Sequence, residues 1–345
     1  MTSTSAHSPN PLAGTAAWFS DQMVEDALDD LPLMSGLREA LAALWRGDVI
    51  QPQRTVMPFS AHHSDNTHVG HGTLFIKPIQ WKDRITVKLI SLVPSNAQRH
   101  LPGLLSTLAV LDAQTGMVIA FMQANALTAR RTAAVSAIAA DLLAKPGRCR
   151  LALLGSGVLA HSHAALMRKV REIDDIRVWS PTKANARACA QAIGAAACDS
   201  AQDAVVDADI VCTLTHAQEP VLMGKWLKHG AFVAAVGAPR PDWRELDDEA
   251  MSHPVVADMR EAALKESGDV IGSGATIVAE LGQLLAQHEQ PSVHQQSLGP
   301  HQQGRLVDQQ GINLQGQTVI FKSLGLAIQD AVAADLVLRA TSGND

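Results

Sequence analysis

The sequence predicts an α/β protein in which a parallel-sheet domain is inserted into a second, discontinuous α+β domain. Three observations predict this fold class. Closely spaced strand-like segments fill residues 54–122, strands and helices alternate between residues 150 and 257, and a glycine-rich turn at 153–160 joins the first of these strands to a helix. The length of 345 residues also fits about two domains.

The first half of the chain begins helical and then becomes rich in strands. Apolar residues recur at helical spacing over residues 21–47. Strand segments follow at residues 54–58, 73–77, 85–90, 108–112 and 117–122. Because Asp112–Gly116 has the residue types of a tight turn, the last two strands are expected to form a hairpin. Strands so close together in sequence indicate an antiparallel sheet.

The second half of the chain alternates between strands and helices. An alanine-rich helix is expected at 131–144, strands at 150–154, 176–179, 208–213, 231–236 and 254–257, and helices at 158–171 and 183–193. Further helices are expected at 275–288 and 326–340, with a mobile connection at 291–311. The predicted domains are a flexible tail at 1–20, an outer α+β domain from 21–130 and 320–345, and the parallel-sheet domain at 131–319.

Composition and charge exclude several classes of protein. Hydrophobic residues make up 47% and charged residues 18% of the chain, which excludes global disorder. The net charge is -6 without a long Lys/Arg run, so no nucleic-acid partner is expected. No apolar stretch reaches the roughly 18 residues of a membrane span. The four cysteines lack CxxC spacing, which predicts reduced, buried thiols in a cytoplasmic protein. Tyrosine is absent, so no tyrosine hydroxyl can act as an acid.

The glycine turn carries the pattern G-x-G-x-x-A that binds dinucleotides in Rossmann domains. Gly155 permits the tight turn, Gly157 lets the backbone approach a pyrophosphate, and Ala160 permits close packing of helix and sheet. The helix that follows begins with Val158 and Leu159, where unpaired N–H groups can bind phosphate. The parallel-sheet domain is therefore predicted to be a Rossmann-type domain that binds a nicotinamide dinucleotide.

The end of the next strand predicts which dinucleotide is bound. An Asp or Glu normally bonds the ribose 2′-hydroxyl of NAD at this place, and the chain has none there. Ser180, Thr182 and Lys183 could instead bind a 2′-phosphate. The sequence thus favours NADPH, with NADH still possible.

Several longer segments resemble the ornithine cyclodeaminase / mu-crystallin family. They are Leu127–Ala134, the glycine turn, Val236–Asp247, Glu261–Val270 and Phe321–Gly325, and the last three are similar to the mu-crystallin (ketimine reductase) branch. The similarity runs from about Gln51 to the C-terminus. It implies a two-domain homodimer in which the outer domain carries the substrate-binding cations and the dimer contact.

By resemblance, Arg54, Lys88 and Arg131 correspond to the cations that hold the carboxylate of an amino or imino acid. The residue types agree with that role, because the planar guanidinium of Arg binds a carboxylate through two hydrogen bonds. All three lie on segments otherwise rich in apolar residues, where a charge needs an anionic partner. Lys88 is also the candidate catalytic residue, which polarises or protonates the imine.

The remaining expected cofactor contacts come partly from the resemblance. Glu266, Lys322 and Ser323 would sit near the nicotinamide, Thr132 would approach the phosphates, and Arg131 would also contact the cofactor. Thr213 and Val236 are expected to line the cofactor groove, because they stand at strand ends. Loosely spaced histidines around His62 and His63 define no tetrahedral site, so no metal is expected.

The resemblance implies NADPH-dependent reduction of cyclic ketimine carboxylates, with a small imino acid as the substrate. Δ1-Pyrroline-2-carboxylate would give L-proline, and Δ1-piperideine-2-carboxylate would give L-pipecolate. The cyclodeaminase branch has a catalytic aspartate where this chain has Pro239. The alternatives are an ornithine cyclodeaminase, an alanine dehydrogenase-like enzyme, and a non-enzymatic crystallin-type protein that binds NADPH.

Overall fold

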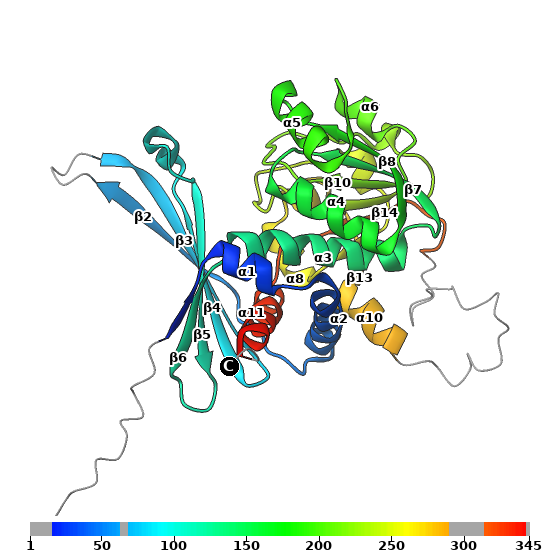
Figure 1. Cartoon of the computed structure of the whole chain (residues 1–345). Helices are drawn as coiled ribbons and strands as arrows, with labels where there is room; N and C mark the ends of the chain where they lie inside the picture. Colours follow the sequence, from blue (N-terminus) through cyan, green and yellow to red (C-terminus); the bar gives the residue numbers. More distant parts are fainter. Residues whose placement is uncertain (1–15, 63–67, 290–313, 343–345) are drawn as a thin grey trace, which may run out of the picture.

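The computed structural model describes residues 16–62, 68–289 and 314–342. It has two sheets, one on each side of a long central helix, α3 (Asn125–Leu143) (Figure 1). The expected connection at 291–311, His63 and most of the expected tail lie outside the described residues. No helix in these three ranges is long and apolar enough to cross a membrane.

The outer domain contains a six-stranded sheet in the order β1-β6-β5-β4-β3-β2. Its strands are β1 (Ala17–Phe19), β2 (Thr55–His62), β3 (His68–Trp81), β4 (Arg84–Leu92), β5 (Leu104–Asp112) and β6 (Val118–Gln123). Strands β2 to β6 form the antiparallel sheet that the sequence predicted, with the β5–β6 hairpin at one side. The expectation of a flexible tail to residue 20 is wrong at its end, because β1 pairs in parallel with β6.

Helices cover only the inner face of this sheet. They are α1 (Asp21–Ala27), α2 (Asp30–Arg46), α3 and the last helix, α11 (Ala327–Ser342) (Figure 1). The segment 21–47 forms two helices rather than one continuous helix. The break occurs where Asp29 accepts the N–H of Leu31 and so caps a new helix, α2.

Helix α3 begins at Asn125, six residues before the start predicted from its alanine-rich part. The carboxylate of Asp21 accepts the N–H groups of Asn125 and Ala126 at 2.9 and 3.0 Å. The cap therefore comes from a residue about a hundred positions earlier, and it replaces the absent side-chain cap of Ala124. Arg131 thus lies in the second turn of the helix and not at its start.

The Rossmann-type domain contains an eight-stranded parallel sheet in the order β13-β12-β14-β11-β10-β7-β8-β9. The strands are β7 (Arg148–Leu154), β8 (Glu172–Trp179), β9 (Ala196–Ala197), β10 (Ile210–Thr213), β11 (Phe232–Ala235), β12 (Val255–Ala257), β13 (Ile277–Glu280) and β14 (Val319–Lys322). The connecting helices include α4 (Val158–Val170), α5 (Lys183–Ile193), α6 (Ala201–Val205), α7 (Asp248–Met251), α8 (Arg260–Glu266) and α9 (Gly268–Ser273).

Two expectations for this domain need correction. The helix predicted at 275–288 begins as strand β13, and only α10 (Leu281–Glu289) is helical. Its β-branched Ile277 and Val278 favour a strand, and β13 pairs with β12. The domain boundary predicted at residue 319 falls at the start of β14, which pairs with β11 and β12 through Lys322. The chain therefore leaves this sheet after Lys322.

Candidate active site

The glycine turn after β7 has the geometry of a phosphate-binding loop. Gly155 has φ +123°, and a Cβ there would lie 2.7 Å from the carbonyl oxygen of Leu214. Gly157 caps α4, and no atom lies within 4 Å of the position where its Cβ would be. The first turn of α4, at Val158 and Leu159, therefore borders open space, and the loop fits the pyrophosphate of a dinucleotide.

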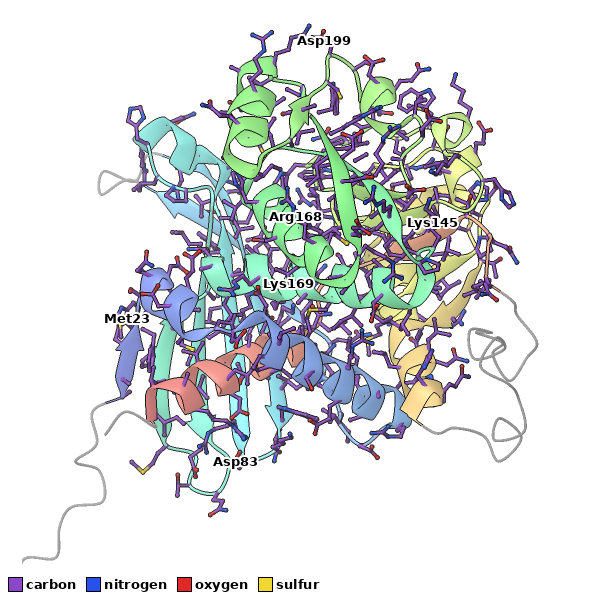
Figure 2. All side chains as sticks on the ribbon, turned by 45° about the vertical axis from the view of Figure 1, so that its right-hand side comes forward. Met23, Asp83, Lys145, Arg168, Lys169 and Asp199 are labelled. Atoms are coloured by element: carbon purple, nitrogen blue, oxygen red, sulfur yellow. The ribbon has the colours of Figure 1, made fainter. Side chains whose placement is uncertain are left out.

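The residues predicted to select the cofactor follow β8. Ser180 is buried, and Thr182 is the N-cap residue of α5, although its side chain makes no capping hydrogen bond. The Nζ of Lys183 lies 2.7 Å from Oδ1 of Asp199, and both side chains are exposed. Sequence analysis did not identify Asp199, which Figure 2 shows at the outer end of the domain. A carboxylate therefore stands beside the predicted 2′-phosphate site.

A buried carboxylate organises the strand ends where the cofactor groove was predicted. Thr213 ends β10, and its hydroxyl donates to Oε2 of Glu245 at 2.7 Å. The other oxygen of Glu245 accepts both the N–H and the hydroxyl of Thr215 at 2.6 Å. Burial raises the pKa of Glu245, although Lys322 and the threonine hydrogen bonds oppose this shift. Val236 follows the adjacent strand β11 and is also buried.

Lys322 connects this carboxylate to the neighbouring loops. Its side chain is fully buried, and Nζ donates to the carbonyl of Gly237 at 2.7 Å and to Asp269 at 2.8 Å. Asp269 in turn accepts the N–H groups of Glu245 and Leu246. The network fixes the backbone at the carboxyl ends of three strands, with Lys322 fully buried at its centre.

Asp258 holds the loop between β14 and α11. Its Oδ2 accepts the N–H groups of Leu324 and Gly325 at 2.8 and 2.9 Å and lies 3.3 Å from the Ser323 hydroxyl. Burial raises the pKa of Asp258 against these hydrogen bonds. The loop thereby places the carbonyl of Gly325 where Lys77 donates to it at 2.8 Å.

Three buried cations surround a single carboxylate on the inner face of the six-stranded sheet. Oδ1 of Asp330 on α11 accepts hydrogen bonds from Lys88 Nζ and from Arg131 Nε, each at 2.9 Å. Lys77 is the register partner of Lys88 on the next strand, and its Nζ lies 3.6 Å from Oδ2 of Asp330. Lys88 and Asp330 are each only 1% exposed. We call these four residues the cation cluster.

The cluster shifts the titration of its members. Burial lowers the pKa of Lys88 to about 7, helped by Arg131 and Lys77 and opposed by Asp330. Burial also lowers the pKa of Lys77. Burial alone would raise the pKa of Asp330, but Arg131 and the two lysines hold it well below its usual range. Lys88 can therefore gain and lose a proton near neutral pH.

Arg54 lies beside this cluster but has a different partner. Its Nη2 is 2.7 Å from Oε2 of Glu266 at the end of α8, and its guanidinium stacks over Phe75. Burial raises the pKa of Glu266, opposed by Arg54 and Lys77. Because Arg54 precedes β2 and Glu266 belongs to the Rossmann-type domain, this ion pair joins the two domains.

The structure brings together most, but not all, of the predicted site residues. Lys88 and Arg131 share one carboxylate. Arg54 and Glu266 each interact with Lys77 through their charges. The hydroxyl of Thr132 donates to the Thr128 carbonyl at 2.7 Å.

Sequence analysis missed four residues of this region: Lys77, Thr128, Gln329 and Asp330. The available signal was a charged residue inside an otherwise apolar strand or helix, which applies to Lys77 and Asp330.

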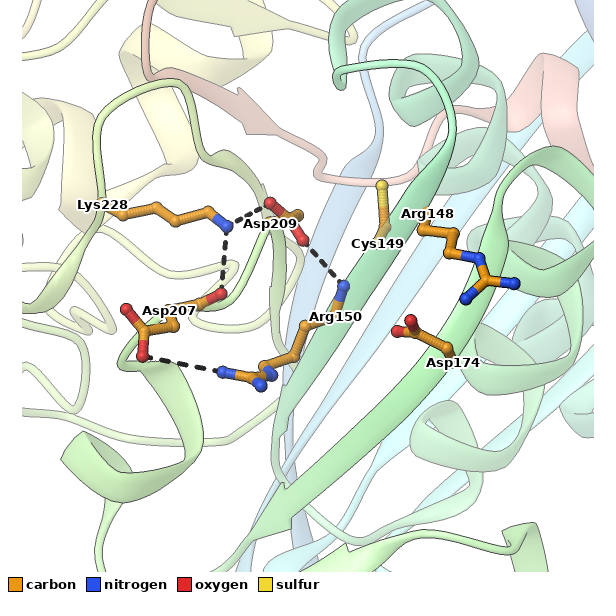
Figure 3. A pocket seen from close by; sticks show the side chains of 7 residues that line it. All are labelled: Arg148, Cys149, Arg150, Asp174, Asp207, Asp209 and Lys228. Atoms are coloured by element: carbon orange, nitrogen blue, oxygen red, sulfur yellow. Dashed lines mark hydrogen bonds and ion pairs between the residues drawn. The ribbon is translucent and has the colours of Figure 1, made fainter.

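A charged cleft at the opposite, amino edge of the parallel sheet is separate from this site (Figure 3). It is lined by Arg148, Cys149, Arg150, Asp174, Asp207, Asp209 and Lys228. Its charges pair with one another, since Asp209 contacts Lys228 and the backbone of Arg150. Within the described ranges, no group of three or more His, Cys, Asp and Glu side chains could hold a metal ion. Cys198, unlike the other three cysteines, is only partly buried.

Comparison with known proteins identifies relatives over nearly the whole chain. The ketimine reductase mu-crystallin of Mus musculus is 38% identical over 335 residues, covering 94% of this chain and 97% of that protein. A Δ1-pyrroline-2-carboxylate reductase of Bacillus cereus (strain ZK / E33L) is 30% identical over 302 residues, covering 83% and 84%.

A solved structure has the same fold. Thermococcus litoralis Δ1-pyrroline-2-carboxylate reductase, in complex with NADH and L-proline, superimposes with a TM-score of 0.79 at 27% identity, covering 95% of this chain and 98% of that one. The model of the ornithine cyclodeaminase/mu-crystallin family matches residues 19–344. The chain therefore belongs to the ornithine cyclodeaminase/mu-crystallin family.

Proposed function

We propose that this protein is a nicotinamide-dependent reductase of cyclic imino acids, which converts Δ1-pyrroline-2-carboxylate to L-proline and Δ1-piperideine-2-carboxylate to L-pipecolate. The observation that carries this proposal is the buried cation cluster, in which three positive side chains face only one carboxylate. The relatives described above support it, because all three are named for reduction of an imine.

The cation cluster supplies the charge that a substrate carboxylate needs. Asp330 compensates one of three positive charges, so Lys77, Lys88 and Arg131 retain an excess that attracts an anion into a buried site. Arg131 donates from Nε to Asp330 and from Nη1 to Gln329, and no described residue accepts from its Nη2. That free edge of the guanidinium binds a substrate oxygen, with Arg54 as a second donor.

Lys88 provides the proton that the reaction consumes. Reduction of a neutral imine to an amine adds a hydride to C2 and a proton to the ring nitrogen. The ammonium of Lys88, with a pKa of about 7, donates that proton from Nζ and is then recharged by solvent. Thr128 accepts a hydrogen bond from Nζ at 2.5 Å and holds the side chain in place. Lys88 must be protonated to donate, so activity falls as the pH rises through about 7.

The Rossmann-type domain would hold the cofactor through the glycine turn and the first turn of α4. When bound, the reduced nicotinamide supplies the hydride. Ser180, Thr182 and Lys183 favour NADPH over NADH, since residues 180–183, which follow β8, include no carboxylate to bond a ribose 2′-hydroxyl. Glu245, Asp269 and Lys322 keep the groove floor rigid, which lowers the cost of orienting the substrate.

Pro239, in the loop after β11, favours reduction over cyclodeamination. Pro239 stands where the cyclodeaminase branch carries an aspartate, and it has no group that can transfer a proton. Preceding Ala238 has φ +51°, so the loop has a fixed, unusual turn. A substrate that is already an imine needs no acid or base at this position.

The proposal includes a homodimer formed through the outer face of the six-stranded sheet. Helices cover the inner face, while Trp18, Leu89, Leu105 and Phe121 stand at 37–56% exposure on the other face (Figure 1). Large exposed apolar patches mark contact surfaces. A second copy of the chain would bury this face against its own equivalent.

The test is a spectrophotometric screen for oxidation of NADPH and of NADH. Each is combined with Δ1-pyrroline-2-carboxylate, with Δ1-piperideine-2-carboxylate, and with pyruvate plus ammonia, and ornithine with NAD⁺ forms a separate arm. The proposal predicts turnover with the cyclic imines and higher kcat/KM with NADPH. Turnover only with pyruvate and ammonia, or with ornithine, contradicts it. Tight NADPH binding without any turnover would indicate the non-enzymatic role.

A further inference from the structure

Asp330 has no evident place in a site that must attract an anion. Its side chain is 1% exposed and negatively charged, and it lies among the cations expected to bind a carboxylate. An aspartate here repels the substrate, and burying its charge costs free energy. Its position therefore requires a benefit that outweighs both effects.

The contacts of Asp330 show what that benefit is. Oδ1 accepts from Lys88 on β4 and from Arg131 on α3, so a single oxygen fixes the two donors relative to each other. Its neighbour Gln329 accepts from Nη1 of Arg131 at 2.8 Å. Together the two α11 residues accept from Nε and Nη1 and leave Nη2 without an acceptor among the described residues.

The second oxygen completes the charge balance. Oδ2 is buried and accepts no hydrogen bond from a described residue, but it lies 3.6 Å from Nζ of Lys77 on β3. Without this carboxylate, two lysines and an arginine would share one buried volume with no anion among them. Repulsion would then be relieved by loss of a proton from a lysine, since arginine keeps its charge.

We propose that Asp330 is a positioning residue of the reductase, the fixed counter-ion that keeps Lys88 protonated and, with Gln329, orients Arg131 toward the substrate carboxylate. This inference rests on the proposed function and extends it to α11. It assigns the C-terminal helix a part in catalysis through residues that do not touch the substrate.

The pH dependence of kcat/KM tests the counter-ion role. The groups that face Lys88 are Asp330 from α11, Arg131 and Thr128 from α3, and Lys77 from β3. Arg54 and Asp258 act on Lys77 from further away. Only Asp330 among the charged neighbours of Lys88 raises its pKa, so removing its charge should move the alkaline limb of the profile to lower pH.

The experiment compares Asp330→Asn, Asp330→Glu and Gln329→Leu with wild type. In Asp330→Asn the alkaline limb should move down by about one pH unit or more, while Asp330→Glu should keep the limb near its wild-type position even if kcat falls. Gln329→Leu should raise the KM for the imino acid with the limb unmoved. Asp335→Asn is the matched control, because Asp335 lies on the same helix but pairs with the exposed Arg339.

The outcomes separate the inference from the proposed function. A wild-type enzyme that turns over no cyclic imine refutes the proposed function. An active wild type whose limb stays in place in Asp330→Asn refutes the counter-ion role. If Asp330→Asn does not fold, Asp330→Glu tests the same role: a shift of its alkaline limb by about one pH unit or more would refute the counter-ion role. An unchanged KM in Gln329→Leu would refute the orientation of Arg131.

Discussion

Gly325 shows how closely the candidate site depends on a single small residue. It has φ +80°, and a Cβ there would lie 2.7 Å from Nη1 and 3.0 Å from Nη2 of Arg131. Its carbonyl also accepts the hydrogen bond of Lys77. Gly325 therefore leaves room for the guanidinium of Arg131, and its carbonyl holds the side chain of Lys77 by a hydrogen bond.

Gly325→Ala should displace Arg131 and raise the KM for Δ1-pyrroline-2-carboxylate about tenfold or more, because about 1.4 kcal/mol of lost binding is tenfold. Steady-state kinetics measure this effect. The control is Gly47→Ala, which has a similar φ of +79° and no atom near its Cβ position. Both variants should lose about 1 kcal/mol of folding stability through backbone strain, but only Gly325→Ala should change KM. Equal kinetics in the two variants would contradict the role given to Arg131.

Ser180 is the residue at which cofactor choice is best tested. Ser180→Asp introduces a carboxylate that bonds a ribose 2′-hydroxyl and repels a 2′-phosphate. The ratio of kcat/KM for NADPH to that for NADH should fall about tenfold or more. Asp199→Asn removes the carboxylate beside Lys183 and should move this ratio the other way. A ratio unchanged in Ser180→Asp means that the 2′-phosphate lies elsewhere.

Only some residues of the candidate site could be predicted from the sequence. Lys88 and Arg131 could be found because they stand in recognisable segments. Asp330 offers only the signal of a charge inside an apolar helix, and its role could not be predicted because it depends on three cations that come from β3, β4 and α3. Distances between residues more than a hundred positions apart are set by packing, which no local pattern encodes.

At the scale of elements, α3 is the helix that connects the two chemical parts of the molecule. Its N-terminal half carries Thr128 and Arg131 to the cation cluster. Its middle contacts α4 of the Rossmann-type domain, where Ser136 lies 3.0 Å from Nε2 of His163. Lys169 on α4, labelled in Figure 2, forms a further contact between the domains, because its Nζ lies 3.9 Å from Oδ2 of Asp30 on α2. Movement of α3 would therefore disturb substrate and cofactor sites together.

His163 gives this contact a measurable pH dependence. Burial lowers the pKa of His163 to about 4, below the ordinary value of 6.5. The folded state thus favours the neutral ring, so its stabilising contribution is complete above pH 6.5 and is lost as the pH falls toward 4. Linkage gives a loss of about 2 kcal/mol near pH 5.

His163→Gln should remove most of that pH-dependent loss, because Gln stays neutral. The free energy of unfolding by urea, measured at about pH 7 and pH 5, should differ less in this variant than in wild type. His161→Gln, at an exposed position on the same helix, is the control. If His163→Gln retains the wild-type difference between the two pH values, α4 does not bury a neutral histidine.

Element boundaries were predicted well only where the cause of the boundary was local. The strand–turn–helix at 150–171 follows from its own glycines and apolar residues. The start of α3 depends on Asp21, and the strand β13 depends on a partner, β12, that comes about 20 residues earlier. A helix cap supplied by a distant segment leaves no signal in the sequence near the start of the helix.

At the scale of the whole molecule, the fold class followed from alternation of strands and helices, and the last helix was expected in the outer domain, but the return of residues 319–322 to the parallel sheet was not predicted. The chain returns to the parallel sheet as β14 and then crosses to the outer domain as α11. This last crossing brings Lys322 and Asp330 to the two sides of the site. Their separation by only eight residues explains how one segment serves both domains.

Assembly can be tested on the uncovered sheet face. Phe121→Asp places a charge in the centre of the proposed homodimer contact, so the variant should be monomeric by light scattering. Leu31→Glu changes an apolar residue that is 66% exposed on α2, away from this face, and should leave the dimer intact. A monomeric wild type, or a Phe121→Asp dimer as stable as wild type, would show that the contact lies elsewhere.

In the proposed enzyme, the buried cations bind the carboxylate of a cyclic imine. The most direct measurement is the ratio of kcat/KM for Δ1-pyrroline-2-carboxylate to that for 1-pyrroline, which lacks the carboxylate, in wild type and in Arg131→Met. We expect wild type to prefer the carboxylate substrate by about 100-fold or more and Arg131→Met to lose most of this preference. Equal rates on both imines in wild type, or an undiminished preference in the variant, would contradict the claim.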